Sequence, residues 1–295
     1  MSARPTDQTP RANPLSRVDA RIVGLRLGFQ LLGPLAPERA ARIAERIFTR
    51  PPQHPLRPQE EAFLETGEPF LVDHAGLRLA GWSWGSGPVV LLMHGWGSRA
   101  GRFRLFVPEL QARGFRVVAF DGPGHGHTGG NSASLPQFAA ALAAVSASVG
   151  PVRAFIGHSL GGAAALFAMT RLVPPVPAVL ISAPSDPVVF WRRFVRHLAI
   201  PPVVRERLQH NLEARFGITW DDLNLVPAAA TLPTPLLVIH DESDEDVPPE
   251  NGREIAGAAP QGTFVLTTGL GHRAIMRNAG VVGLAVDFVS DRVPR

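Results

Sequence analysis

One serine stands where a nucleophile would need to be. Gly-His-Ser-Leu-Gly at 157–161 places Ser159 directly after a buried apolar run, 152–156, and before a helical pattern, 160–171. A serine on a sharp strand–turn–helix bend is exposed for attack, and its glycines let the chain bend and pack closely. The start of a helix also favours a developing negative charge. This context predicts a nucleophile elbow with Ser159 as the nucleophile.

A serine hydroxyl needs a base to remove its proton, and histidine is the usual one. In folds with such an elbow, the acid and then the base follow the nucleophile along the chain. Four histidines lie downstream, and His197 and His210 fall in a helical segment. His240 ends a buried strand, which favours a structural role. His272 follows glycine-rich residues after the last strand, and we predict that it is the base.

The acid that orients the histidine is less sharply defined, because one loop holds five acidic residues. We favour Asp244, which lies four residues beyond the strand that precedes the loop. Asp246 is the second choice, and Asp186, after the previous strand, is a third. The other acids of the loop are expected to be solvated; they are Asp241, Glu242 and Glu245.

An oxyanion hole needs two backbone N–H groups that converge on the reacting oxygen. The amide of Leu160, next to the nucleophile, is the first candidate. The second is the amide of Trp96, in the loop His-Gly-Trp-Gly-Ser at 94–98 that follows another buried strand. His94 itself is expected to form hydrogen bonds within this loop.

Short apolar strands that alternate with helices surround these residues and imply a mostly parallel sheet covered on both faces. Eight strands and five helices are predicted in this domain. The strands are 70–73, 77–84, 88–94, 115–120, 152–156, 178–182, 235–240 and 263–267, and the helices are 103–113, 135–149, 160–171, 249–258 and 278–290.

Residues 185–230 interrupt this alternation and predict a small helical cap inserted in the domain. Its apolar residues recur at helical spacing. With Trp96, three of its aromatic residues are candidates for the substrate pocket, although packing within the cap is the commoner role of such aromatic residues; they are Phe190, Trp191 and Phe194.

The segment before the domain divides into a disordered tail, 1–15, and a basic helical arm with a Pro-rich linker, 16–58. The domain itself is expected over 59–295. Gly33-Pro34 should end the first arm helix, and Pro37 should begin the second. Two interpretations of the arm remain open. It packs on the domain or on a partner subunit, or it lies on a membrane surface, since arginines flank its apolar face.

Composition excludes several classes of protein. The chain has no Lys, Tyr or Cys, so its high isoelectric point reflects a small arginine excess, with a formal charge of only +4. That excess lies within residues 1–50, which argues against a nucleic-acid groove on the domain. No disulfide or thiolate metal site is possible, and we expect no metal and no cofactor. Without a secretory signal or a long apolar run, a cytoplasmic location is expected.

Five motifs in order resemble those of the α/β-hydrolase superfamily. They are the loop at 94–98, Asp-Gly-Pro-Gly-His-Gly-His-Thr at 121–128, the elbow at 157–162, the acid loop at 240–248 and Gly-His at 271–272. Thr128 replaces the usual final Ser, and Asp241 replaces a Gly. The resemblance covers about 70–290 and implies the triad Ser159, Asp244 and His272.

The resemblance implies an esterase-like serine hydrolase that cleaves a small-molecule carboxylic ester through a Ser159 acyl-enzyme. A membrane-associated lipase, a thioesterase or an acyltransferase would use the same triad. Haloperoxidases without a cofactor, amidases and carbon–carbon hydrolases also occur in the superfamily. Its dehalogenases and epoxide hydrolases place Asp at the nucleophile position, so Ser159 counts against both. A non-catalytic binding protein is the remaining alternative. The sequence leaves the oligomeric state open.

Overall fold

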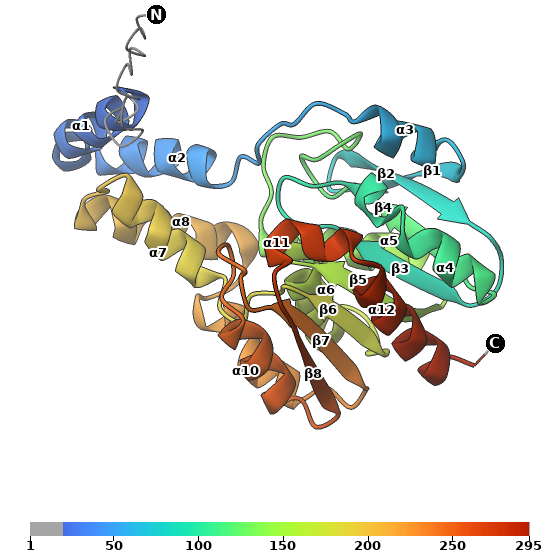
Figure 1. Cartoon of the computed structure of the whole chain (residues 1–295). Helices are drawn as coiled ribbons and strands as arrows, with labels where there is room; N and C mark the ends of the chain where they lie inside the picture. Colours follow the sequence, from blue (N-terminus) through green and yellow to red (C-terminus); the bar gives the residue numbers. More distant parts are fainter. Residues whose placement is uncertain (1–19, 295) are drawn as a thin grey trace, which may run out of the picture.

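The apolar runs of the sequence form one eight-stranded sheet (Figure 1) in a computed structural model that describes residues 20–294. The predicted α/β-hydrolase fold is confirmed. The eight strands are β1 (Glu68–His74), β2 (Leu77–Trp84), β3 (Val89–Met93), β4 (Arg116–Phe120), β5 (Val152–His158), β6 (Ala178–Ile181), β7 (Leu236–Asp241) and β8 (Gly262–Thr267).

The strand order is β1-β2-β4-β3-β5-β6-β7-β8. β2 is antiparallel to both of its neighbours, and all other pairs are parallel. The register pairs Met93 with Gly157, and His158 with Ile181. The loops after β3, β5, β7 and β8 therefore emerge at one edge of the sheet, as expected where a parallel sheet carries a site.

Helices cover both faces of the sheet, so strands buried on both sides read as continuous apolar runs. One face is covered by α5 (Leu135–Val149), α6 (Leu160–Arg171), α9 (Leu225–Ala230) and α10 (Glu250–Ala258). The other is covered by α3 (Pro58–Leu64), α4 (Phe106–Ala112) and α12 (Ala279–Arg292). A short helix, α11 (Gly271–Ala274), precedes α12.

The segment between β6 and β7 is helical, with α7 (Val188–His197) and α8 (Pro202–Phe216) followed by α9. The first two project beyond the sheet (Figure 1). Two arm helices lie on them, α1 (Ala20–Leu35) and α2 (Pro37–Phe48). Arm and cap share one apolar cluster, which includes Phe29 of α1, Ala44 of α2 and Leu208 of α8.

Polar contacts also join the arm to the cap. Arg26 donates to the carbonyl of His197 (2.8 Å), and Gln30 donates to the carbonyl of Ala199 (2.6 Å). The arm and the cap therefore form one helical layer beside the sheet. No helix in the described range has the length and apolarity that crossing a bilayer requires.

Some helix boundaries differ from the prediction. α1 continues through Gly33-Pro34 to Leu35. Pro34 lies in the last turn, where it removes only one helical hydrogen bond, and the amide of Ala36 still donates to Leu32 (2.8 Å). The helix expected over 103–113 begins only at Phe106, after a 3₁₀ turn at Ala100–Phe103. The predicted tail, 1–15, lies outside the described residues.

Candidate active site

Ser159 stands between β5 and α6 with a φ of +52°. A non-glycine residue rarely adopts this left-handed backbone, and such strain is found mainly at functional sites. The amide of Ser159 donates to the carbonyl of Ile181 on the neighbouring strand (2.8 Å), which fixes the bend to the sheet. The residue is 9% exposed and lines a cavity. The geometry is that of a nucleophile elbow.

Three glycines are required around this bend. A Cβ on Gly157 would lie 2.5 Å from the Cα of Gly162, and one on Gly161 would collide with the carbonyl of Met93. A Cβ on Gly95 would lie 2.9 Å from the Cβ of Ser159. The chain after β3 therefore passes directly against the elbow, and only glycine allows so close an approach.

Asp244 and His272 are brought together from two different loops. Nδ1 of His272 donates to Oδ2 of Asp244 (2.8 Å), and the amide of Val247 donates to Oδ1 (2.8 Å). Burial alone would raise the pKa of Asp244. Hydrogen bonds from His240, His272 and the Val247 amide outweigh burial and hold that pKa well below the usual carboxyl value. Asp244 therefore remains a carboxylate that can orient His272.

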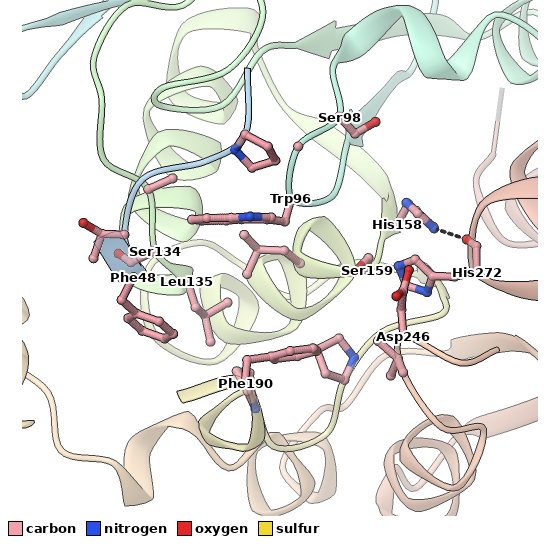
Figure 2. Close-up of a pocket in the computed structure, with 18 of the residues that line it drawn as sticks. Phe48, Trp96, Ser98, Ser134, Leu135, His158, Ser159, Phe190, Asp246 and His272 are labelled. Atoms are coloured by element: carbon pink, nitrogen blue, oxygen red, sulfur yellow. Dashed lines mark hydrogen bonds between the residues drawn. The ribbon is translucent and has the colours of Figure 1, made fainter. Parts of the chain in front are cut away.

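The two other candidate acids have different partners, although Asp246 also lines the cavity beside Ser159 and His272 (Figure 2). The side chain of Asp246 is 53% exposed and lies 3.8 Å from the Arg273 guanidinium. Asp186 accepts from the amide of Val188 at the start of α7 (3.0 Å) and lies 3.5 Å from Arg192. Neither carboxylate forms a hydrogen bond with His272 among the described contacts, so the geometry favours Asp244.

The remaining downstream histidines have structural surroundings. His197 is on α7 and His210 on α8, and neither lines the cavity. His240 is fully buried, and its Nε2 donates to the carbonyl of Val247 across the acid loop (2.9 Å). His240 thereby holds the loop that carries Asp244.

Asp241 is a site residue that sequence reasoning missed. It was expected to be solvated, but it is fully buried. Its Oδ1 accepts from the amides of Leu270 (3.1 Å) and Gly271 (2.8 Å), just before His272. Burial opposes its ionisation, but hydrogen bonds, chiefly from Ser243 and the Gly271 amide, lower the pKa of Asp241 to about 2. This carboxylate ties the acid loop to the base loop. The sequence signal that could have indicated this role is that Asp241 replaces the glycine of the superfamily's motif.

The candidate oxyanion donors come from two segments that adjoin Ser159. Leu160 is the first residue of α6, where amides have no partner within the helix. Trp96 follows Gly95, the residue that touches Ser159. Neither the Trp96 nor the Leu160 amide donates to another group in the described part of the chain. Both are therefore free to bind a developing oxyanion.

Two histidines fix the loop that carries Trp96. Nδ1 of His94 donates to the Gly95 carbonyl (2.7 Å), and Nε2 accepts from the amide of Gly122 (2.9 Å). Nε2 of His125 accepts from the amide of Gly97 (2.9 Å). Burial lowers the pKa of both rings, that of His125 to about 3, so both stay neutral and can accept. The expected loop role of His94 is confirmed, whereas that of His125 was not predicted.

His158 contacts the candidate base directly. Its Nε2 donates to the backbone carbonyl of His272 (2.9 Å), and the two rings lie 4.9 Å apart (Figure 2). Burial, and then the nearby His272, lower the pKa of His158 to about 3. The neutral imidazole of His158 therefore helps to fix the backbone of His272, the candidate base. No sequence pattern predicted this contact, which joins residues 114 positions apart.

A cavity of about 940 Å³ opens above Ser159 and His272. Figure 2 shows Trp96, Leu135 and Phe190 around it, with Ser159 and His272 at one side. Trp191 lines it as well, so three of the four predicted pocket residues contribute. Phe194, one turn further along α7, is not among the residues that line this cavity. Its ring packs behind the wall against Phe48, 5.0 Å away.

The arm and linker supply another wall of this cavity. Phe48, at the end of α2, lines it together with the linker residues Pro52, His54 and Leu56. The linker is fastened by Arg99, which donates to the carbonyls of His54 and Pro55. The segment before the hydrolase domain is thus part of the pocket. No cluster of three potential metal ligands occurs within the described residues.

A family model described as "Alpha/beta hydrolase family" matches residues 89–284. This chain belongs to that family. A pimeloyl-[acyl-carrier protein] methyl ester esterase of Xanthomonas campestris is 28% identical over 251 residues, covering 68% of this chain and 94% of the esterase. A non-heme haloperoxidase of Rhodococcus erythropolis is 31% identical over 133 residues, and the match spans about half of that relative (48%) and 40% of this chain.

Solved structures agree on the fold. A thermophilic esterase from Thermogutta terrifontis superposes with a TM-score of 0.59 at 18% identity, over 77% of this chain and 100% of the esterase. The relatives and neighbours support membership among the hydrolases, and esterases recur among them.

Proposed function

We propose that this protein is a carboxylesterase that acts through a Ser159 acyl-enzyme. The observation that carries the proposal is the convergence of three loops. The strained Ser159 and the candidate base His272 line one largely apolar cavity, and the buried Asp244 accepts a hydrogen bond from His272. A nucleophile, a base and a group that orients the base are the parts that acyl transfer needs.

In the proposed mechanism, Nε2 of His272 takes the proton of Ser159 as Oγ attacks the ester carbonyl carbon. The amides of Trp96 and Leu160 stabilise the oxyanion. The bond to the alcohol oxygen then breaks, and His272 returns the proton to the departing alkoxide. This leaves an acyl group on Ser159. His272 next takes a proton from water, the hydroxide attacks the acyl carbon, and the carboxylic acid leaves as Oγ regains a proton.

The cavity supports a substrate with a sizeable apolar acyl group. About 940 Å³ is large compared with an acetyl group, and aromatic side chains such as Trp96, Phe190 and Trp191 surround it. The Xanthomonas relative is named as an esterase of a pimeloyl-[acyl-carrier protein] methyl ester, which supports an ester substrate. A thioester or an acyl transfer to an alcohol would use the same groups, so a medium-chain carboxylic ester is the first substrate to test.

The test is hydrolysis of p-nitrophenyl esters from acetate to palmitate. We expect kcat/KM to rise from acetate to a medium chain, because each buried CH₂ adds about 0.8 kcal/mol of transfer free energy. Ser159→Ala should abolish turnover at every chain length while leaving the melting temperature within a few degrees. Ester turnover that survives in Ser159→Ala would refute the proposal, as would absence of turnover with every ester in a folded wild-type protein.

A further inference from the structure

The outer surface of the arm is unusually apolar. Along α1, Val23, Leu27, Leu31 and Leu35 recur every four residues and are 40%, 58%, 70% and 85% exposed. The opposite side of α1 packs into the cluster shared with the cap. α2 continues the pattern with exposed side chains at Ile43 and Ile47, whereas Ala40, Ala41 and Ala44 are buried. An exposed stripe of this size marks a contact surface.

In the described part of the arm, the acidic side chains are paired, whereas several arginines form no ion pair. Its two acids in α2 are paired: Glu45 accepts from Arg215 of α8 (2.7 Å), and Glu38 accepts from Arg42 (3.3 Å). α1 contains no acidic residue. By contrast, exposed arginines form no ion pair with any described acid and accompany the apolar stripe; they are Arg39, Arg46 and Arg50. These arginines and the six exposed apolar residues are called the arm outer face below.

Apolar side chains flanked by unpaired arginines match an anionic bilayer surface. We propose that the arm outer face docks flat on a membrane that carries anionic lipids. The inner faces of α1 and α2 are already packed on the cap, so the helices lie on the bilayer instead of crossing it. A second copy of this chain fits less well, because a symmetric contact would bring the same arginines together.

Docking there would place the cavity close to the lipid. Ile47 is on the arm outer face, and the next residue, Phe48, lines the cavity. Leu56 of the linker both lines the cavity and is 45% exposed. If the proposed esterase function holds, on which this step rests, apolar esters dissolved in the membrane can reach Ser159 past these residues. Docking itself does not depend on catalysis.

The first test is flotation of full-length Ser159→Ala protein with vesicles, which separates binding from activity. We expect binding to phosphatidylcholine–phosphatidylglycerol (7:3) vesicles and at least about tenfold weaker partitioning into pure phosphatidylcholine. Binding should weaken as salt rises from about 0.05 to 0.5 M, because the arginine contacts are screened. Equal and salt-independent binding to both vesicles, or binding to neither, would overturn the proposal.

Variants locate the surface. Leu27→Gln with Leu31→Gln should lower partitioning at least about tenfold, since two largely exposed leucines no longer enter the lipid. The matched control is Leu71→Gln with Leu172→Gln, at sites 60% and 50% exposed on other elements. It should bind as the parent does.

Two arginine variants, one on the arm and one elsewhere, test the contribution of charge. Arg46→Gln should weaken binding to the anionic vesicles, whereas the exposed Arg78 on β2, changed to Gln, should have no effect. Circular dichroism melting must show that every variant is folded. Equal losses in the arm variants and in their controls would contradict this location. So would a dimer without lipid, measured by light scattering, that Leu27→Gln with Leu31→Gln converts to monomer while vesicle binding is absent.

Discussion

Replacing Asp244 by asparagine separates its electrostatic role from its shape. The side chain is fully buried, and its Oδ1 accepts from the amides of Asp246 (3.1 Å) and Val247 (2.8 Å). Asparagine can keep both bonds through its oxygen. Its NH₂ group would then face Nδ1 of His272, which now donates to Oδ2 (2.8 Å). Two donors cannot pair, so the imidazole proton moves to Nε2.

That tautomer cannot accept the proton of Ser159. A serine hydrolase whose base is held in the wrong tautomer loses about 10³- to 10⁴-fold in activity, which corresponds to about 4–5.5 kcal/mol of transition-state stabilisation. We expect a fall of this size in kcat/KM for a p-nitrophenyl ester. Asp246→Asn changes a side chain that is 53% exposed, 3.8 Å from Arg273 and not bonded to His272, so it should lower kcat/KM far less than Asp244→Asn does.

The assay is initial-rate kinetics at pH 8 with urea unfolding on the same samples. The unfolding curves must show that both variants are folded. A larger loss in Asp246→Asn than in Asp244→Asn would contradict the assignment of the acid. Near-wild-type activity in both variants would mean that neither carboxylate orients His272.

Three further predictions follow from individual contacts. Gly161→Ala, which forces a Cβ against the Met93 carbonyl, should cost about 2–3 kcal/mol in urea unfolding, whereas Gly257→Ala, with open space around it, should gain up to about 1; equal effects would contradict the packing at the elbow. His158→Leu should lower kcat about tenfold, with KM changed less than about twofold, because the His272 carbonyl loses its donor; an unchanged kcat would remove this positioning role. The pKa of Asp241 is lowered to about 2 on folding, so its stabilisation is present above about pH 4 and lost toward pH 2. Asp241→Asn should therefore make the free energy of unfolding depend less on pH over that range. An unaltered pH dependence would contradict the hydrogen bonds assigned to Asp241.

The sequence predicted what depends on local pattern. Continuous apolar runs such as 89–93 and 152–156 identify strands buried on both faces, and these gave the sheet. The elbow was predictable because glycine spacing, strand and helix all occur within fifteen residues of Ser159. His272 was selected as the candidate base by elimination, since each alternative histidine lay in a different kind of segment.

Contacts between distant segments were not predictable in this way. Asp241 was read as one of several solvated acids, because its burial depends on amides near position 270. Phe194 was expected in the pocket from its spacing to Phe190, but spacing does not reveal that Phe48 fills the space beside it. The arm had no counterpart in the recognised motifs, so its place in the cavity wall emerged only from the tertiary structure.

The most direct test of the central claim is the site of covalent labelling by a fluorophosphonate. Intact-protein mass spectrometry after treatment should show one adduct per chain, and peptide mapping should locate it on Ser159. Ser159→Ala should remain unlabelled, and prior incubation with a medium-chain ester should slow labelling of the wild type. An adduct on another residue, or undiminished labelling of Ser159→Ala, would contradict the claim that Ser159 is the nucleophile.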